Sequence, residues 1–551
     1  MSESGLVVET SLGPIKGRQC EGVYGHTFYS FEKIPFAEVP VGELRFRPPQ
    51  PKQPWSQVLE CTQPALKPLQ RNILTNQFEG SEDCLYLNIY AKQLKSDKPL
   101  PVIVFLFGGG FEKGDPTVDL HGPDYFMMKD VVFVTIGYRL GPFGFLQFKD
   151  PEIKAPGNNG LKDQLVALRW IKENISRFNG DAANITLSGE SAGAAAAHYL
   201  MCCPLAKGLF HKAILMSGNI LCSWAYSPLE NVPYRLAKAC GYEGPADNEK
   251  LILEYLQQQP GENLLKHYIN TKDENLNDCL FTFGPCVEPY ASDMCIINKH
   301  PEQMLGESWG NNIPVLMSGT SCEGLLMFPR VHMAQFLLTE LEDSPQHCLP
   351  LSLKLKYPAD VQKSLGEKIK YTHFADKKAT MENIMRYCEY ASYKVFWHPI
   401  LRFIKARTTA SAAPTYLYRF DFDSPDFNHQ RIKYCGKQMR GVAHVDDHSY
   451  LFYGNFSWKL SPETDEYKTI ERMVDIWYSF AVQSNPNGCR IENELLNGSW
   501  LPVNHTTSSG NLKCLNINRD LAIIDLPEMK KLQVWESVYE EDRQIPTNNS
   551  I

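Results

Sequence analysis

The stretch NITLSGESAG, residues 184–193, decides the fold of this chain. Its first residues are typical of a buried strand, Gly-x-Ser-x-Gly follows around Ser191, and the small residues after it predict a helix. A serine at so tight a turn has a strained backbone, so Gly189 and Gly193 must leave room on either side. The pattern predicts a serine nucleophile, with Ala192 small enough for its N–H to face a reacting carbonyl. A chance match in a loop is the alternative.

A second apolar run, residues 101–107, ends directly in the glycine triplet 108–110. Backbone N–H groups of glycines can approach a ligand without interference from a Cβ, which is what an oxyanion hole requires. A tight turn would use the same residues. The triplet precedes Ser191 along the chain, as expected for an earlier strand of the same sheet.

Short apolar runs alternate with helical patterns along much of the chain. The other runs that predict buried strands are residues 131–136, 213–216, 314–317 and 415–420. Between two of the strands, residues 160–178 have apolar side chains at helical spacing. The alternation predicts an α/β fold with a mostly parallel, doubly wound central sheet.

Two longer stretches and the N-terminus complete the predicted organisation. Residues 5–17 predict a hairpin, and therefore a small antiparallel sheet at the N-terminus. The stretches near 225–310 and 330–410 are more helical, and we expect them to be insertions that cap the carboxyl edge of the sheet. No linker or repeat separates them, so we expect a single domain over residues 1–551.

Composition excludes several classes of partner. The chain has 551 residues, 43% of them apolar, and 55 basic against 63 acidic side chains give a net charge of −8. Such a balance argues against nucleic acid or an anionic membrane as the main partner. No apolar run is long enough for a transmembrane segment.

The expected location is the cytoplasm. The N-terminus lacks the basic and apolar regions of a secretory signal, and the 16 cysteines are scattered, as for mostly free thiols in a reducing compartment. An endomembrane-associated or secreted protein is the alternative. Asn-x-Ser/Thr triplets that favour this alternative begin at Asn174, Asn184, Asn455, Asn497, Asn504 and Asn548.

Several longer motifs occur in a fixed order along the chain. They are IPFA at 34–37, GELRF at 42–46, SEDCLYLN at 81–88, YRLG at 138–141, GLKDQ at 160–164 and GESAG at 189–193. On these motifs, which cover nearly its whole length, the chain resembles the carboxylesterase/cholinesterase family (type B carboxylesterases), and within it most closely the insect α-esterases. The resemblance implies an α/β-hydrolase fold with helical cap insertions, and an enzyme that hydrolyses carboxylic esters with no cofactor and no metal.

The resemblance also implies a catalytic triad of Ser191, Glu323 and His444. A serine hydroxyl is a poor nucleophile until a neutral imidazole accepts its proton and a carboxylate orients the imidazole. Two simpler explanations remain: Glu323 as a solvated surface charge, and His444 as a structural histidine. A metal shared by His444 and His448 is a third, but His-x-x-x-His alone is a weak pattern.

By the same resemblance, Gly109, Gly110 and the N–H of Ala192 are the expected oxyanion donors. Phe107 stands where many esterases have a histidine before the glycines, although cholinesterases also carry an aromatic residue there. Glu190, next to the serine, is either a carboxylate that assists water activation in deacylation or a purely structural group.

The substrate pocket is expected to include Trp224 and Leu280, which could otherwise be ordinary core residues. The loop at 62–83 contains no tryptophan, whereas cholinesterases hold a quaternary ammonium on one there. Gly-Glu-Ser at 189–191 differs from the Gly-Gln-Ser of juvenile-hormone esterases. The first difference argues against choline esters and the second against a juvenile-hormone esterase, and we expect a small apolar carboxylic ester as the substrate.

The resemblance further implies two structural pairs. Cys61 and Cys84 match the first disulfide of the family, which would stay open in a reducing cytosol. Arg45 and Glu82 match a structural ion pair.

We therefore expect a serine esterase that forms an acyl-enzyme on Ser191, reacts with organophosphates and serves detoxification or lipid-ester metabolism. The alternative is a non-catalytic or very slow ligand-sequestering member of the same fold. A triglyceride lipase is the third candidate and would need an exposed apolar lid. We expect a monomer or a weak homo-oligomer.

Overall fold

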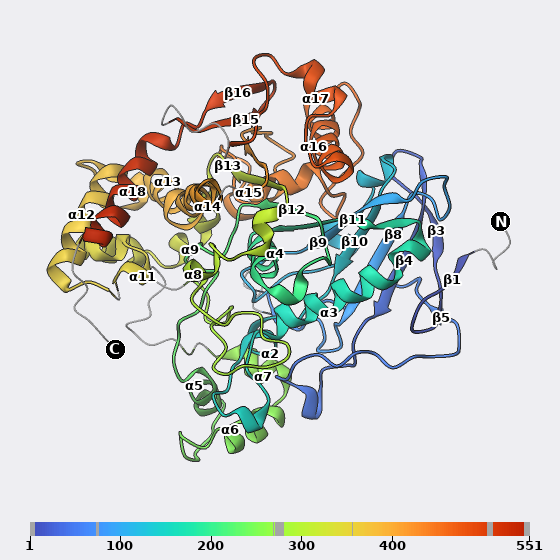
Figure 1. Ribbon diagram of the computed structural model, residues 1–551. Coiled ribbons are helices and arrows are strands. Elements are labelled where there is room, and N and C mark those ends of the chain that lie inside the picture. The colour runs from blue at the N-terminus through green and yellow to red at the C-terminus, as the bar shows by residue number, and fades with distance from the viewer. Residues whose placement is uncertain are drawn as a thin grey trace.

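A twisted sheet of 11 strands runs through the centre of the molecule (Figure 1). The computed structural model describes residues 6–72, 77–267, 269, 280–354, 356–410, 412–503 and 511–544. The strands are, from one edge of the sheet to the other, β16 (Leu521–Asp525), β15 (Lys513–Ile517), β14 (Thr415–Phe420), β13 (Val315–Thr320), β12 (Lys212–Met216), β11 (Gly180–Glu190), β9 (Leu100–Leu106), β10 (Val132–Ile136), β8 (Tyr86–Ala91), β4 (Thr27–Pro35) and β3 (Arg18–Glu21).

The central strands of this sheet are parallel and its edges antiparallel. Every neighbouring pair from β10 through β9, β11, β12, β13 and β14 to β15 is parallel. At the edges, β10–β8, β8–β4, β4–β3 and β15–β16 are antiparallel. The predicted α/β fold with a mostly parallel sheet is confirmed.

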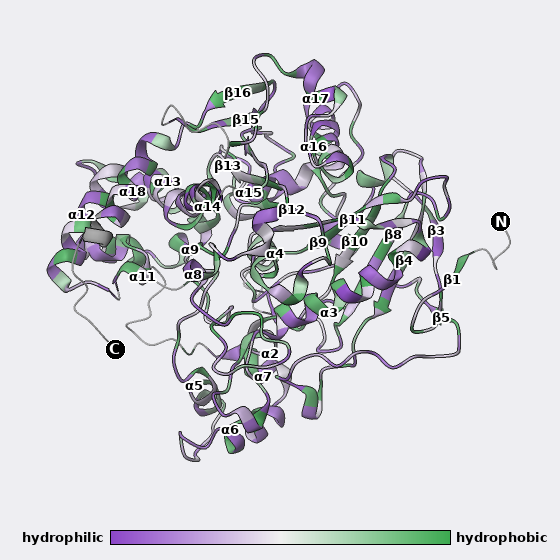
Figure 2. Ribbon diagram, in the orientation of Figure 1, coloured by the Kyte–Doolittle hydropathy of each residue, from purple (hydrophilic) through white to green (hydrophobic). Residues whose placement is uncertain are grey.

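Two core clusters cover the two faces of the sheet, and β9 separates them. Val102, Val104 and Leu106 enter one cluster, while Ile103 and Phe105 enter the other, because successive side chains of a strand point to opposite faces. Helices α3 and α4 pack into the first cluster and α16 into the second. In Figure 2, helix α3 carries both hydrophobic and hydrophilic residues, as expected of a helix that covers a sheet with one face.

The helix predicted at 160–178 is α3 (Asn159–Asn174), which continues as a 3-10 turn at Ile175–Phe178. Helix α4 (Ala192–Cys202) begins where β11 ends, as predicted. The remaining helices outside the two helical stretches are α1 (Val118–His121), α2 (Gly141–Phe145), α15 (His429–Cys435), α16 (Asp465–Gln483), α17 (Cys489–Glu494) and α18 (Met529–Gln544).

The two stretches expected to be helical insertions do carry helices. Near 225–310 these are α5 (Val232–Ala239), α6 (Glu249–Gln257), α7 (Gly261–Lys266) and α8 (Pro301–Met304). Near 330–410 they are α9 (Phe328–Met333), α10 (Phe336–Asp343), α11 (Leu351–Lys354), α12 (Ala359–Phe374), α13 (Ile384–Ser392) and α14 (His398–Thr409). In Figure 1, α5 and α6 lie at the bottom, whereas α12 and α13 lie at the left. The division of the chain into domains stays a prediction.

A small second sheet lies at the N-terminus. The predicted hairpin is the antiparallel pair β1 (Val7–Glu9) and β2 (Pro14–Lys16). The third strand, β5 (Leu59–Glu60), pairs with β2 in parallel, so this sheet is mixed rather than purely antiparallel. A two-stranded ribbon consists of β6 (Gln70–Arg71) and β7 (Phe78–Glu79).

Helices of the described part of the chain lack the combination of length and apolar character that crossing a membrane requires. Of the Asn-x-Ser/Thr triplets, those at Asn504 and Asn548 lie outside the described residues.

Candidate active site

Ser191 lies at the turn between β11 and α4, with φ +53° and ψ −119°. Its N–H donates to the Met216 carbonyl at 2.8 Å, which ties the turn to β12. A Cβ on Gly189 would lie 2.4 Å from the Gly193 carbonyl carbon, and one on Gly193 would lie 2.0 Å from the Leu106 oxygen. Both glycines are therefore required by close backbone contact, and the positive end of α4 faces the serine.

Glu323 and His444 are joined by a short hydrogen bond. Glu323 begins a 3-10 helix just after β13, and its Oε2 lies 2.6 Å from Nδ1 of His444. The other oxygen, Oε1, accepts from the Thr320 N–H at 2.7 Å and from the Ser217 hydroxyl at 2.5 Å. Since an ionised carboxylate only accepts, Nδ1 carries the imidazole proton and Nε2 is left as a base.

Ser191 lies beside this pair at the carboxyl edge of the sheet. A Cβ on Gly218 would lie 2.3 Å from the Ser191 carbonyl oxygen, and the preceding residue, Ser217, donates to Glu323. Among the described residues, no hydrogen bond joins the Ser191 hydroxyl to His444. Such bonds are often long until substrate binds. The catalytic roles of these residues stay predictions.

The predicted oxyanion donors are free to donate. In the part of the chain that the structure describes, the N–H groups of Gly109, Gly110 and Ala192 have no acceptor. Gly109 and Gly110 have φ angles of +111° and +68°, a region that favours glycine. The Gly109 carbonyl accepts from the Lys113 N–H at 3.1 Å, so the loop closes on itself. The geometry suits the binding of a developing negative charge.

Phe107, which replaces the histidine of many esterases, stacks on Tyr138. The ring centroids are 4.3 Å apart and the planes differ by 15°. The Tyr138 hydroxyl donates to the Phe107 carbonyl at 2.6 Å. A Cβ on Gly114 would lie 2.1 Å from the Phe107 ring, so this ring is enclosed on a second side. These contacts hold the strand end from which the glycine loop starts.

Glu190 is buried directly before Ser191. Its Oε1 accepts from the Gly108 N–H at 2.8 Å, whereas its Oε2 has no hydrogen-bond partner. Burial raises the pKa of this carboxyl, and the nearby His444 and the Gly108 bond offset part of the rise. Glu190 thus links the serine turn to the glycine loop.

A segment beginning at residue 280 covers the glycine loop. The Phe281 ring lies where a Cβ on Gly110 would fall, 2.2 Å away. Glu112 accepts from the N–H groups of Thr282 and Phe283 at 2.9 and 3.2 Å. Sequence analysis missed Phe281 and Glu112, because neither belongs to a motif and they meet only in the fold.

The covering segment is also anchored to α3. Lys162 and Glu288 form an ion pair of 2.8 Å in which both side chains are fully buried. Glu288 also accepts from the Ile296 N–H at 2.8 Å.

The two predicted pocket residues lie in different surroundings. Trp224 is buried and its Nε1 donates to the Val395 carbonyl at 3.1 Å. Its ring centroid is 6.0 Å from that of Phe396, which in turn lies 4.4 Å from the His444 ring. Leu280 is half-buried, and its carbonyl accepts from Arg330 at 3.0 Å. Whether either residue contacts the substrate stays a prediction.

His448, the partner of the metal alternative, is enclosed by other rings. Its centroid lies 5.0 Å from Phe452, 5.5 Å from His121 and 5.6 Å from Phe105. Burial lowers its pKa well below the usual value, and His444 is already bound to a carboxylate.

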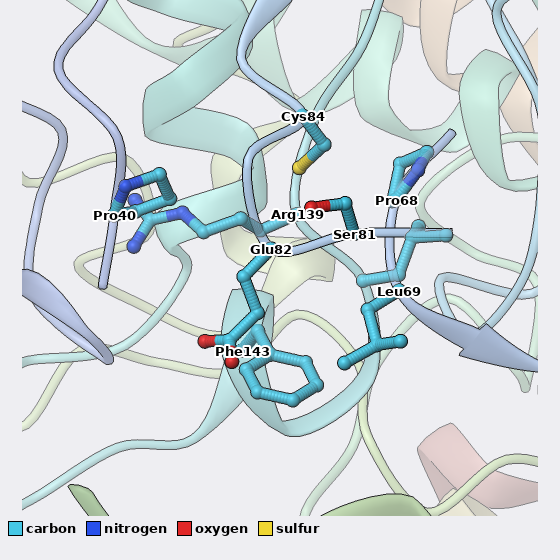
Figure 3. A pocket seen from close by; sticks show the side chains of 9 residues that line it. Pro40, Pro68, Leu69, Ser81, Glu82, Cys84, Arg139 and Phe143 are labelled. Carbon is cyan, nitrogen blue, oxygen red and sulfur yellow. The ribbon is translucent and has the colours of Figure 1, made fainter. Parts of the chain in front are cut away.

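The expected ion pair is present, and the matched cysteines are thiols. Arg45 binds both oxygens of Glu82, at 2.5 and 2.7 Å. Cys61 and Cys84 are buried and free, and burial raises the pKa of the Cys61 thiol to about 12. Figure 3 shows a cavity beside Glu82, Cys84 and Arg139, with a volume of about 10 Å³. That volume holds at most about one water molecule, so this cavity is no substrate site.

A mostly parallel sheet with an acid–imidazole pair beside a strand-turn-helix serine is the arrangement of the α/β-hydrolases. The carboxylesterase family model matches residues 4–535, and the chain belongs to this family. Esterase B1 of Culex pipiens is 37% identical over 549 residues, covering 98% of this chain and 99% of the relative. Juvenile hormone esterase of Heliothis virescens is 31% identical over 516 residues, covering 89% of this chain and 87% of that one.

A solved structure supports the same conclusion. The crystal structure of juvenile hormone esterase from Manduca sexta, with OTFP covalently attached, superposes with a TM-score of 0.85. It is 28% identical in sequence and covers 97% of this chain and 99% of its own. The chain is thus a carboxylic-ester hydrolase, and its substrates are small esters.

Proposed function

We propose that the protein hydrolyses apolar carboxylic esters through an acyl-enzyme on Ser191. The observation that carries this proposal is the 2.6 Å hydrogen bond between Glu323 and His444 beside the strained serine turn. The free N–H groups of Gly109, Gly110 and Ala192 support it as oxyanion donors. A solved relative has OTFP covalently attached, which agrees with a covalent intermediate.

Each step uses groups of this chain. Nε2 of His444 accepts the proton of Ser191 as Oγ bonds to the ester carbon, and the oxyanion is bound by the free N–H groups. The bond to the alcohol oxygen then breaks, and the imidazolium returns the proton to that oxygen. Water then attacks the acyl carbon of the acyl-enzyme while His444 accepts a proton from the water. The bond from the acyl carbon to Oγ breaks, the imidazolium returns the proton to Oγ, and the carboxylic acid leaves. Glu323 stabilises the imidazolium throughout.

The same nucleophile should react with organophosphates. Attack by Ser191 Oγ on phosphorus, with loss of the leaving group, forms a phosphoryl-enzyme. We infer that detoxification or lipid-ester metabolism is the biological role. The apolar surroundings of Trp224 and Phe281 favour apolar acyl and alcohol groups.

A pre-steady-state burst tests the mechanism. With a p-nitrophenyl ester in a stopped-flow instrument, we expect about one equivalent of nitrophenol per site, followed by slower turnover. Ser191→Ala should abolish the burst. Ser188→Ala is the matched control, since Ser188 is also buried in β11 but donates to the Val104 carbonyl. Wild type that binds the ester but shows neither burst nor turnover would support a ligand-sequestering protein.

We further propose a cytoplasmic location and a monomer or weak homo-oligomer. The free, buried thiols of Cys61 and Cys84 are consistent with a reducing compartment. Light scattering across protein concentrations tests the oligomeric state, and fractionation of cells that express the protein tests the location.

A further inference from the structure

Two lysines flank Tyr434 next to the glycine loop. Lys113 leaves this loop, and a Cβ on Gly109 would lie 2.9 Å from Cγ of Lys113. Nζ of Lys113 lies 5.9 Å from the centre of the Tyr434 ring. Nζ of Lys433 lies 5.7 Å from the same ring and 5.5 Å from that of Phe456. Lys113 is half-buried and Lys433 is exposed. Of the two lysines beside Tyr434, Lys113 is therefore the one further from the protein surface.

Neither ammonium has an ion-pair or hydrogen-bond partner within the described residues. The carboxylates that face Lys113 at longer range are Glu112 and Glu190. Glu112 already accepts from two backbone N–H groups, and Glu190 from that of Gly108.

Further positive charge surrounds the same place. Burial lowers the pKa of the Lys113 ammonium, and the charges of Lys433 and Arg330 lower it further, whereas the two carboxylates offset part of this effect. A half-buried cation without a partner is poorly solvated, so an anion beside it would be favourable.

The position of Lys113 relates it to the substrate. The glycine loop beneath its side chain carries the predicted oxyanion donors, and Glu190, within electrostatic range, precedes Ser191. Lys113 therefore lies on the same loop as the groups expected to bind the ester at Ser191. We propose that, among esters with an apolar acyl or alcohol chain, the site prefers those whose chain ends in a negatively charged carboxylate, which Lys433 attracts and Lys113 binds. This inference rests on the proposed ester hydrolysis at Ser191.

A matched substrate pair tests the preference. One is the mono-4-nitrophenyl ester of glutaric acid, with a free carboxylate, and the other is its methyl ester, which is neutral. We expect Lys113→Met to lower the ratio of kcat/KM for the charged over the neutral ester by about tenfold at low salt. Lys113→Arg should retain the ratio, and Lys113→Glu should lower it further. Lys95→Met, at an exposed lysine elsewhere, is the control and should leave it unchanged.

Binding without turnover separates this proposal from the proposed function. By calorimetry, we expect monomethyl glutarate to bind Ser191→Ala protein more tightly than dimethyl glutarate, and Lys113→Met to remove the difference. If the wild-type protein shows no burst but monomethyl glutarate still binds more tightly than dimethyl glutarate, only the serine mechanism is overturned. An unchanged ratio of kcat/KM in Lys113→Met would overturn the preference. Equally tight binding of butyrate would also overturn it, because the only carboxylate of butyrate is the one that ester hydrolysis would produce.

Discussion

The hydroxyl of Ser217 donates a 2.5 Å hydrogen bond to Oε1 of Glu323, on the side of the carboxylate opposite His444. Ser217 follows β12 directly and has φ +49°, so backbone strain is stored at this position. The serine thus orients the predicted acid.

We expect Ser217→Ala to lower kcat about tenfold, because a hydrogen bond to a charged group in a buried site is lost. KM should change less, because the lost hydrogen bond orients the predicted acid and not the substrate. Steady-state kinetics with p-nitrophenyl butyrate measures both. Ser188→Ala, which loses a neutral hydrogen bond in β11, should retain kcat. Equal losses in the two variants would contradict a positioning role.

Glu190→Gln should stabilise the protein increasingly as pH rises. Burial raises the pKa of Glu190 above its ordinary 4.5, so above that pH the folded protein retains a proton that the unfolded chain has lost. The free energy of unfolding therefore falls as pH rises through this interval, and glutamine removes the effect while still accepting from Gly108. Calorimetry should show the Tm difference, variant minus wild type, growing from about pH 4.5 upward. A Tm difference that shrinks as pH rises would contradict this prediction, because it would show that the fold stabilises the carboxylate. The control is Glu254→Gln, at an exposed glutamate, for which we expect no such trend.

Gly193→Ala should destabilise the fold by about 3 kcal/mol or more, although alanine favours helices. The added Cβ would lie 2.0 Å from the Leu106 carbonyl oxygen, and backbone cannot move aside cheaply. Denaturant unfolding measures the loss. Gly306→Ala is the control, because a Cβ there meets nothing within 4 Å. Similar stability of the two variants would disprove the close contact between α4 and β9.

Trp224→Leu should favour longer acyl chains. The indole is buried near Phe396, whose ring packs on His444, so a smaller side chain opens space toward the reacting centre. We expect kcat/KM for p-nitrophenyl octanoate relative to the acetate to rise about tenfold. Trp309→Leu loses similar hydrogen bonds, to the Leu200 and Cys203 carbonyls, and should leave this preference unchanged. If the preference stays constant in Trp224→Leu, Trp224 is a core residue only.

Local patterns predicted the centre of the sheet well. Runs such as 213–216 and 415–420 became β12 and β14, because strands covered on both faces must be continuously apolar. Strand β11 is longer than the predicted 184–187, beginning at Gly180. Residues 181–184 of this strand are half-buried or exposed, and no continuous apolar pattern marks them.

The surroundings of the site were less accessible to sequence analysis. Glu323 and His444 were predicted only through motif resemblance, since nothing local relates residues so far apart in the chain. The contact of Phe281 with Gly110 and the bond from Ser217 to Glu323 have no sequence signal at all. Both depend on how loops from different strands meet at the edge of the sheet.

The ion pair of Lys162 and Glu288 restricts how the site can open. Withdrawing either side chain would leave an uncompensated charge in the interior, at a cost of about 3–5 kcal/mol. The stretch that covers the glycine loop is thus fastened at one end to a core helix. Its other end is held to the glycine loop, because Glu112 accepts from the N–H groups of Thr282 and Phe283, so the covering segment stays over the loop that carries the predicted oxyanion donors.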